Sequence, residues 1–442
     1  MAAPHATGTS AGAKQGLWAW INKRLPVDEF ISEQLTGYYA PKNFNIWYFF
    51  GSLALLVLVL QLATGIFLTM FYKPGEATSF DSVEFIMREV NYGWLIRYLH
   101  STGASAFFIV VYLHMFRGLM YGSYRKPREL LWIIGCLIYF ALMGEAFFGY
   151  LLPWGQMSYW GAQVIVNLFS TVPFIGDGLG TWIRGDFTIS DVTLNRFFSF
   201  HVIAFPLVLL LLVAVHLMAL HEVGSNNPDG IEIKKQPKDA KTGIYLDGIY
   251  SHPYYTIKDL VGVVFFLAVF FFVVFFIPDV GGYFLEANNF IPADPLKTPE
   301  HIAPVWYFTP YYAILRAVPS KMLPFVPPTQ FYGVLAMAVA VLIFCFLPWL
   351  DRGAVKSIRY RGTLYKSWLA LFVFCFFLLG YLGTVPVTIW GQFSGGWTEI
   401  LDTKDKATWV ARILTVAYFL FFVLMPWYTA RDKTKPVPER VQ

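Results

Sequence analysis

The chain has 442 residues, of which 57% are hydrophobic, 19% are aromatic and only 14% are charged. Soluble domains carry roughly one quarter charged residues, so this composition excludes a soluble globular protein and indicates a membrane protein. The formal net charge is +5, and the distribution of basic residues along the chain explains it without a nucleic-acid partner.

Eight apolar segments are long enough to cross ~30 Å of hydrocarbon as helices. The sequence therefore predicts an all-α integral membrane protein with eight transmembrane helices and with both ends on the same side. The predicted spans lie at about 47–71, 94–120, 130–152, 194–220, 260–277, 331–350, 367–384 and 409–427.

The basic residues predict which side that is. Of the 33 Lys and Arg residues, 21 lie in the two tails and in three alternate loops, 8 in the other four loops and 4 inside spans. By the positive-inside rule both termini are cytoplasmic, in a bacterial inner membrane that the chain crosses repeatedly. Residues 1–46 lack the apolar core and cleavage site of a signal peptide. Residues 16–25 form either a short interfacial helix or part of a solvated tail.

The first four spans share an interval of fourteen or fifteen residues. Fourteen residues advance ~21 Å along a helix and rotate through nearly four whole turns, so both members of a pair leave one face at two depths. The pairs, span by span, are Gly51 and Gly65, His100 and His114, Gly135 and Gly149, and His201 and His216.

Spans two and four run in the same direction, so His100 and His201 match in depth near the outer face, and His114 and His216 match near the inner face. Two facing helices would then offer two bis-histidine sites. An iron porphyrin held by two imidazoles has no open coordination position, which favours electron transfer. The chain has no C-x-x-C-H sequence, which excludes covalent attachment and leaves b-type haem. A single intramembrane histidine could equally hydrogen-bond a neighbouring helix.

The glycine pairs follow the histidine spacing and would leave room where a flat porphyrin passes, although small residues also serve ordinary helix packing. Three arginines near span ends, Arg97, Arg117 and Arg196, are candidates for pairing with haem propionates. Snorkelling towards lipid head groups is the alternative for each of them.

These assignments divide the chain into four parts. Residues 1–46 form a cytoplasmic tail or interfacial helix, and 47–222 a haem-binding four-helix domain. Residues 223–256 form a cytoplasmic connection, and 257–442 a second four-helix domain with a long periplasmic loop. Long loops over a helical bundle usually carry function.

Four motifs make a more specific assignment possible: GYLLPWGQMSYWG at 149–161, TLNRFF at 193–198, HEVGSNNP at 221–228 and HPYYTIKD at 252–259. The chain resembles cytochrome b of the respiratory cytochrome bc complex, of bacterial type, from about residue 42 to 428. The resemblance implies a quinol–cytochrome c oxidoreductase with a proton-translocating Q cycle. It implies a low-potential haem at His100 and His201 and a high-potential haem at His114 and His216. It also implies a Rieske iron–sulfur protein, a membrane-anchored c-type cytochrome, ubiquinol and ubiquinone as partners, and a homodimer.

The resemblance further implies an outer quinol pocket built from Tyr150, Trp160, Gly161 and the segment Pro304, Val305, Trp306 and Tyr307. Familiar members of the family have Pro-Glu-Trp-Tyr in that segment, and Val305 cannot ionise. We therefore expect a nearby carboxylate to accept the quinol proton, with Glu286 as first candidate and Asp294 as second. Both could instead be solvated loop charges.

The inner quinone site is carried over from the family onto His221 and Asp259, which could hydrogen-bond the quinone carbonyls and deliver protons. Lys258 could draw protons from the cytoplasm or could be an ordinary inside-positive charge.

The interval from His201 to His216 is one residue longer than the His100 to His114 interval, and a kink at Pro206 is the expected means of accommodating it. Two other functional classes stay open on the residues alone. One is a haem-free proton-coupled transporter. The other is the cytochrome b anchor of another dehydrogenase.

Overall fold

The computed structural model describes residues 16–32, 36–241, 243–319, 330–384 and 406–442. Within these ranges, seven helices are long and apolar enough to cross a membrane. The bent pair Thr408–Val423 and Met425–Arg431, with 59° between its halves, completes an eighth span. The predicted all-α membrane fold is confirmed. Residues 320–329 and 385–405, which belong to two of the predicted loops, and the first fifteen residues of the tail lie outside the described residues.

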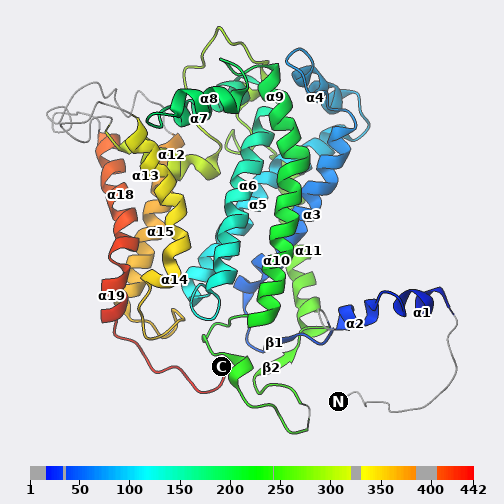
Figure 1. Ribbon diagram of the computed structural model, residues 1–442, viewed down its shortest axis with the longest axis vertical. Coiled ribbons are helices and arrows are strands. Elements are labelled where there is room, and N and C mark those ends of the chain that lie inside the picture. Colours follow the sequence, from blue (N-terminus) through cyan, green and yellow to red (C-terminus); the bar gives the residue numbers. More distant parts are fainter. Residues whose placement is uncertain (1–15, 33–35, 242, 320–329, 385–405) are drawn as a thin grey trace.

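The first group of helices contains every predicted haem ligand. Helix α3 packs along α5, and α6 packs along α10 (Figure 1). The members of this group are α3 (Phe49–Thr69), α5 (Gly93–Tyr121), α6 (Glu129–Leu151) and the continuous run α9 (Asp191–Ser199), η3 (Phe200–Ala204) and α10 (Phe205–Val223).

Helix α11 (Tyr254–Phe276) joins this first group instead of the second. It packs against α3 and α5, where buried Phe270 and Val274 meet Ala106 in a small apolar cluster. The expected domain boundary at residue 257 therefore does not follow the packing, because the apolar face of α11 is buried against the haem-binding helices.

The second group lies beside the first (Figure 1) and is tied to it in the membrane interior. The Tyr139 hydroxyl of α6 donates to the Tyr311 hydroxyl of α12 at 3.0 Å. Pro348 and Pro426 stand in the first turns of α14 and α19, where a missing N–H interrupts the helical hydrogen bonds. The members of the group are α12 (Thr309–Ala317), α13 (Phe331–Leu342), η7 (Ile343–Phe346), α14 (Leu347–Leu350), α15 (Thr363–Thr384), α18 (Lys406–Val423) and α19 (Met425–Arg431).

Short elements cover the two ends of the bundle. One end, the α7–α8 end, carries α4 (Ser79–Arg88), α7 (Gln156–Ser170), α8 (Gly176–Arg184) and η5 (Ala287–Phe290). The other, the β end, carries η2 (Ile46–Tyr48), η4 (Ile233–Lys235) and the antiparallel strands β1 (Tyr39–Pro41) and β2 (Gly248–Tyr250). The short helix η6 (Trp306–Phe308) lies further in, where Tyr307 stacks on Phe108 of α5.

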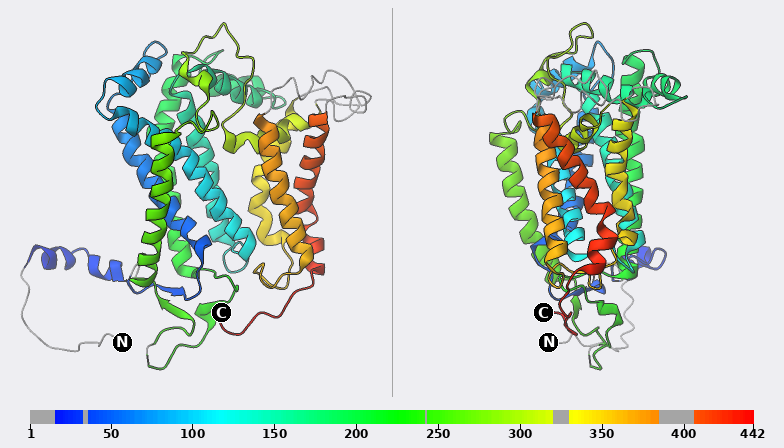
Figure 2. Two further views of the ribbon diagram at one scale, coloured as in Figure 1. Left: turned by 180° about the vertical axis from the view of Figure 1, so that it is seen from behind. Right: turned by 90° about the vertical axis from the view of Figure 1, so that its left-hand side faces the viewer.

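The C-terminus lies at the β end, where Arg440 pairs with buried Asp247 at 2.8 Å. The first described helices, α1 (Leu17–Asn22) and α2 (Val27–Ile31), project sideways from the same end (Figure 2). Trp18 and Trp20 on α1 are more than half exposed, as an interfacial helix requires. Both ends of the described chain thus lie on one side of the bundle, as an even number of spans requires.

The fourth span contains a π-helical turn at η3, in which Phe205 N–H bonds to the Phe200 carbonyl five residues back. A π turn inserts one extra residue into an α-helix. His201 lies inside this turn, and Pro206 follows it in the first turn of α10. The extra residue between His201 and His216 is therefore absorbed by the π turn, so the expectation of a proline kink alone was incomplete.

Candidate functional site

Each of the four predicted glycines lies against one of the four histidines. A Cβ added to Gly65 or Gly51 on α3 would lie 3.3 or 3.4 Å from Cε1 of His100 or His114 on α5. On α6, a Cβ on Gly135 would lie 3.3 Å from Cε1 of His216. The glycines therefore make room for the imidazole rings themselves, and not only for a porphyrin as expected.

Gly149 is the closest of the four contacts. A Cβ there would lie 2.8 Å from Nδ1 of His201 and would overlap Cε1 of the same ring. Because Gly149 has no side chain, it leaves a notch in the surface of α6 that the His201 ring enters. The Nδ1 atom of the ring thereby reaches the carbonyl of Glu145, four residues before Gly149, at 3.0 Å. A carbonyl oxygen only accepts, so Nδ1 is the donor in this hydrogen bond.

His100 also donates from Nδ1. Its Nδ1 lies 3.0 Å from Thr64 Oγ1, and the Thr64 hydroxyl donates its own hydrogen to the Leu60 carbonyl at 2.7 Å. The His100 and His201 ring centroids are 6.0 Å apart, with their planes at 87°. A metal–imidazole bond is about 2 Å long, so this separation accommodates one metal ion bonded to an Nε2 on each side.

The two rings line a cavity of about 250 Å³ near the α7–α8 end, here called the imidazole cavity. Arg97 and both notch glycines, Gly65 and Gly149, also line it. An iron porphyrin requires two imidazole nitrogens to bind its iron, a cation to pair with its carboxylate side chains, and walls without bulky side chains, which the two glycines provide. The residues present fit a bis-imidazole haem.

The second pair, His114 and His216, lies nearer the β end on the same two helices. Nδ1 of His114 is buried without a hydrogen-bond partner among the described residues. Arg117, one turn further along α5, has its guanidinium carbon 4.8 Å from the centre of the Tyr48 ring and its Nε buried without a partner. Unpaired buried polar atoms are rare in folded proteins, and the free Nε of buried Arg117 fits an anionic group such as a haem propionate.

Arg196 does not join the imidazole cavity. Its Nη1 donates to the Trp182 carbonyl at 2.6 Å, and its side chain lines the larger cavity described next. Five residues of helix correspond to a rotation of about 500°, so Arg196 leaves the helix roughly 140° away from His201. The predicted propionate role is therefore not matched by its position.

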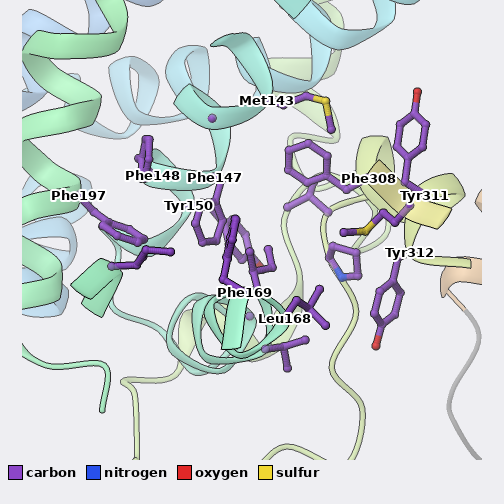
Figure 3. Close-up of a pocket in the computed structure, with 18 of the residues that line it drawn as sticks. Met143, Phe147, Phe148, Tyr150, Leu168, Phe169, Phe197, Phe308, Tyr311 and Tyr312 are labelled. Carbon is purple, nitrogen blue, oxygen red and sulfur yellow. The ribbon is translucent and has the colours of Figure 1, made fainter. Parts of the chain in front are cut away.

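A second cavity, of about 720 Å³, lies between the two groups of helices at the α7–α8 end (Figure 3). We call it the aromatic cavity because Phe147, Phe148, Phe169, Phe308 and several tyrosines line it. Among the predicted quinol-site residues, Tyr150, Gly161, Pro304 and Val305 line this cavity. A large apolar pocket with few polar groups suits a hydrophobic ligand such as a quinone.

Tyr150 and Val305 line both cavities, so they form a shared wall. The Tyr150 hydroxyl donates to Glu286 Oε2 at 2.9 Å, which places a carboxylate at that wall. Burial raises the pKa of Glu286 to about 7, and the Tyr150 hydrogen bond offsets only part of this effect. Glu286 can therefore take up and release a proton near neutral pH.

The remaining predicted residues of this region surround the aromatic cavity without lining it. Tyr307 stacks on Phe108 with 3.9 Å between ring centroids and lines the imidazole cavity. The Trp306 indole donates to Ser105 Oγ at 3.0 Å, and the Trp160 indole to the Asp294 carbonyl at 3.3 Å. The Asp294 carboxylate is exposed and accepts from Leu296 N–H at 2.9 Å, so it is used within its own turn.

At the β end, the His221 ring stacks on Tyr38 with centroids 4.5 Å apart, and Ser52 on α3 hydrogen-bonds Asp259 on α11. The Lys258 amine donates to the Tyr254 hydroxyl at 2.7 Å. Both His221 and Asp259 thus lie at the β end of the first group of helices, one depth level beyond the His114 and His216 pair.

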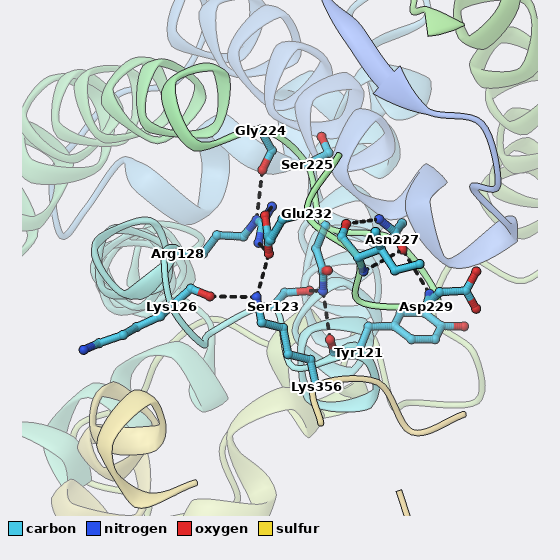
Figure 4. A network of polar contacts seen from close by, with 12 residues as sticks. Tyr121, Ser123, Lys126, Arg128, Gly224, Ser225, Asn227, Asp229, Glu232 and Lys356 are labelled. Carbon is cyan, nitrogen blue, oxygen red and sulfur yellow. Dashed lines mark hydrogen bonds and ion pairs between the residues drawn. The ribbon is translucent and has the colours of Figure 1, made fainter. Parts of the chain in front are cut away.

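A buried polar network holds the end of α10 that carries His221 (Figure 4). The Arg128 guanidinium donates to the Gly224 carbonyl at 2.9 Å and pairs with both Glu232 oxygens at 2.6 and 2.8 Å. Lys356, from the second group, adds a 2.6 Å contact to Glu232. Burial alone would raise the pKa of Glu232, but these two partners outweigh it and the pKa is lowered.

Sequence reasoning missed Thr64 and Glu145, the two partners of the imidazole Nδ1 atoms. Thr64 gives no distinct signal, because hydroxyl residues are common in membrane helices. Glu145 does give one: it is the only acidic residue inside any of the eight predicted spans. Ionisable residues at such positions are costly and usually functional.

Comparisons with known proteins agree with this geometry. The family described as "Cytochrome b/b6/petB" matches residues 35–224, and "Cytochrome b(C-terminal)/b6/petD" matches residues 292–419. A cytochrome b of Allochromatium vinosum is 58% identical over 425 residues, which cover 96% of this chain and 97% of the relative. A "Cytochrome b/c1" of Bradyrhizobium diazoefficiens is 42% identical over 96% of this chain and 56% of the longer relative.

Among solved structures, a chain of a "Hyperthermophilic respiratory Complex III" superimposes with a TM-score of 0.79. It is 38% identical, and the match covers 93% of this chain and 98% of that one. Both groups of helices are therefore shared with these proteins, not the first group alone.

Proposed function

We propose, from the premise that this chain belongs to the cytochrome b family, that it is the electron-transfer subunit of a quinol–cytochrome c oxidoreductase. It oxidises quinol near the outer face, carries electrons across the membrane between two b haems and reduces quinone near the inner face. The observation that carries this proposal is the set of four histidines, each seated against a glycine, at two levels of one bundle. The transporter and dehydrogenase-anchor alternatives are set aside, because the family match extends over both halves of the chain.

His100 and His201 would hold one non-covalent haem and His114 and His216 the other. Bound in this way, a haem supplies one-electron transfer and offers no open coordination position to oxygen. The hydrogen bonds on Nδ1 of His100 and His201 keep each Nε2 available and fix the ring orientations. Arg97 and Arg117 would neutralise haem propionates at the two levels.

The aromatic cavity is the proposed quinol-oxidising site. Its apolar lining binds the quinol ring and excludes water, while the Tyr150 and Val305 wall brings the ring next to the imidazole cavity. Quinol oxidation releases two electrons and two protons. Val305 cannot accept a proton, so Glu286, hydrogen-bonded to Tyr150, takes one and passes it outwards along its loop. Tyr307, Trp306 and Trp160 hold the surrounding segments in place.

His221 and Asp259 form the proposed quinone-reducing site. An imidazole and a carboxylate can each hydrogen-bond a quinone carbonyl and deliver a proton to it. The network of Arg128, Glu232 and Lys234 fixes the end of α10, since the Lys234 amine donates to the His221 carbonyl at 2.8 Å.

The proposal includes partners and location. One electron from each quinol leaves through a Rieske iron–sulfur protein to a membrane-anchored c-type cytochrome, and the complex is a homodimer in a bacterial inner membrane with both termini cytoplasmic. The name "Cytochrome b/c1" of the Bradyrhizobium relative supports a c-type partner, because it joins the two cytochromes in one longer chain. The apolar side chains exposed along α11, such as Phe265 and Phe276 at 72%, support contact with lipid.

The direct test is turnover of the purified complex with ubiquinol and cytochrome c. The account expects two cytochrome c molecules reduced per quinol consumed in net turnover, because half of the oxidised quinol is regenerated at the inner site. This activity should be lost in His201→Leu and in His216→Leu. A complex that turns over normally without either histidine would contradict the proposal.

A further inference from the structure

Helix α6 presents a glycine notch twice, fourteen residues apart, but the two notches differ in hydrogen bonding. Each of the two glycines, Gly135 and Gly149, receives a histidine ring. The backbone carbonyl four positions before Gly149 hydrogen-bonds Nδ1 of His201, whereas Nδ1 of His216, beside Gly135, has no hydrogen-bond partner among the described residues. The residue four positions before the glycine is Glu145 at the notch near the α7–α8 end and Leu131 at the notch near the β end. The two levels therefore also differ in whether the ring meets a carboxylate.

The Glu145 side chain turns back to His201. Its Oε1 lies 3.0 Å from Nδ1, the same distance as the Glu145 carbonyl, so a single N–H is shared by two acceptors of one residue. Its Oε2 is buried without a hydrogen-bond partner, and the side chain lines the imidazole cavity. Among the described residues His201 is the only ion-pair partner of Glu145, and neither Lys nor Arg pairs with it.

The β-end level has no such acceptor. Leu131 is buried and aliphatic, and Nδ1 of His114 and Nδ1 of His216 both lack a hydrogen-bond partner among the described residues. At the α7–α8 level, by contrast, both rings donate from Nδ1, one to Thr64 and one to Glu145. The asymmetry between the two levels is thus built from side chains that lie outside the metal coordination.

An acceptor on Nδ1–H makes the opposite nitrogen a stronger electron donor to a metal. A stronger donor stabilises the oxidised, more positively charged iron, and hydrogen bonding around the ligands is one of the means by which a protein sets a haem potential. We propose that Glu145 is a positioning residue that orients His201 and lowers the reduction potential at the His100 and His201 site below that at the His114 and His216 site. This inference rests on the proposed function, since it presupposes two bound haems. The resulting difference favours electron movement from the quinol-oxidising end to the other.

The test is an equilibrium redox titration of the intact complex, followed at the b-type absorption bands, with low-temperature electron paramagnetic resonance of the two oxidised haems. Glu145→Leu reproduces the β-end arrangement, and Glu145→Thr removes the carboxylate with a side chain that can bond its own helix. Glu145→Gln is the matched control, because it keeps an oxygen acceptor of the same length.

Both removal variants are expected to raise the lower midpoint by about tenfold in the reduction equilibrium, ~59 mV for a one-electron couple, and to leave the upper midpoint unchanged. The paramagnetic resonance signal of the lower-potential haem should shift together with its midpoint. The Glu145→Gln variant should keep most of the wild-type midpoint. Leu131→Gln should reciprocally lower the upper midpoint.

An unchanged lower midpoint in whichever removal variant assembles with both bands would overturn the inference, as would equal shifts of both midpoints. A shift of the lower midpoint in Glu145→Gln as large as in Glu145→Leu would overturn the hydrogen-bond mechanism. Absence of b-type bands from the wild-type complex would instead refute the proposed function, so the two failures are distinguishable.

Discussion

Individual side chains set the geometry of the two histidine pairs, and the glycines matter as much as the ligands. A methyl group at Gly149 would overlap the His201 ring, whereas one at Gly51 would lie 3.4 Å from His114, a contact that a small shift relieves. Gly149→Ala should therefore lose roughly half of the b-type absorbance per chain, the half with the lower potential, because one of two sites is displaced. Gly51→Ala should keep both bands. Spectra of the two purified variants check this, and equal spectra would contradict it.

Glu286 carries the second prediction at this scale. With a pKa of about 7, the carboxyl is ionised and able to accept a proton only at and above neutral pH. Quinol-dependent cytochrome c reduction should rise with pH through about 7 in the wild type. Glu286→Gln should lower it by tenfold or more and flatten the profile, since a general base typically contributes ~10²–10⁴-fold.

Asp294→Asn is the matched control for Glu286, because Asp294 lies on the same loop and its exposed carboxylate accepts a hydrogen bond within its own turn. It should leave the pH profile unchanged. Turnover that is unaffected by Glu286→Gln at every pH would remove Glu286 from the mechanism.

The residue scale also shows how far sequence reasoning reaches. Intervals of fourteen residues, and of fifteen in one pair, identified the four histidines and the four glycines, because helical periodicity fixes which residues share a face. They could not supply the Nδ1 partners, since Thr64 and Glu145 meet their rings across helix pairs whose contact depends on tertiary packing. The same limit explains Arg196, whose sequence distance from His201 hid its opposite direction.

At the scale of elements, the π turn of η3 reconciles the fifteen-residue interval of α10 with the fourteen-residue interval of α5. Deleting exposed Ile203 from that turn should restore a plain α-helix and preserve both b-type bands. Deleting exposed Leu211 from the regular helix should instead rotate His216 by ~100° relative to His201 and abolish at least one band. Haem spectra of the two deletion variants measure this, and loss of both bands on deletion of Ile203 would argue against the π-turn explanation.

The polar network at the β end is the second element that can be tested. Arg128 is buried and paired through two hydrogen bonds with Glu232, so Arg128→Gln leaves a buried carboxylate without its main partner, at a cost of about 3–5 kcal/mol. The pKa of Glu232 is lowered in the folded protein, so its ion pairs stabilise the fold at neutral pH. This stabilisation is lost as the pH falls and the carboxylate becomes protonated.

The temperature at which the solubilised protein loses its b-type absorbance should fall in Arg128→Gln. Lys126→Ala is the control, because the Lys126 side chain is exposed and only its carbonyl takes part in the network. Equal thermal stability of the two variants would show that the network does not hold the loops together.

Element boundaries were predictable from hydropathy to within a few residues, and the bend between α18 and α19 follows from Pro426. The sequence could not predict which helices α11 packs against. A run such as Phe270 to Phe276 is apolar on all sides, so nothing in its pattern distinguishes a face for lipid from a face for α3 and α5.

On the scale of the whole molecule, the two groups of helices enclose the aromatic cavity between them and place both described ends of the chain at the β end. The proposed topology predicts that a reporter enzyme that folds only in an oxidising compartment is active when inserted at Leu296, which is 97% exposed. The same reporter fused after Gln442 should be inactive. Activity in the reverse pattern would invert the assignment of the outer and inner sites.

The central claim is that two haems lie one above the other between α5 and the α9 to α10 run. The measurement that tests it most directly is the number of b haems per polypeptide in the purified protein and in single His→Leu variants at positions 100, 114, 201 and 216. The account predicts two haems in the wild type and one in each variant, with His100 and His201 removing the same haem and His114 and His216 the other. A wild-type protein with fewer than two haems, or variants that pair the histidines differently, would contradict it.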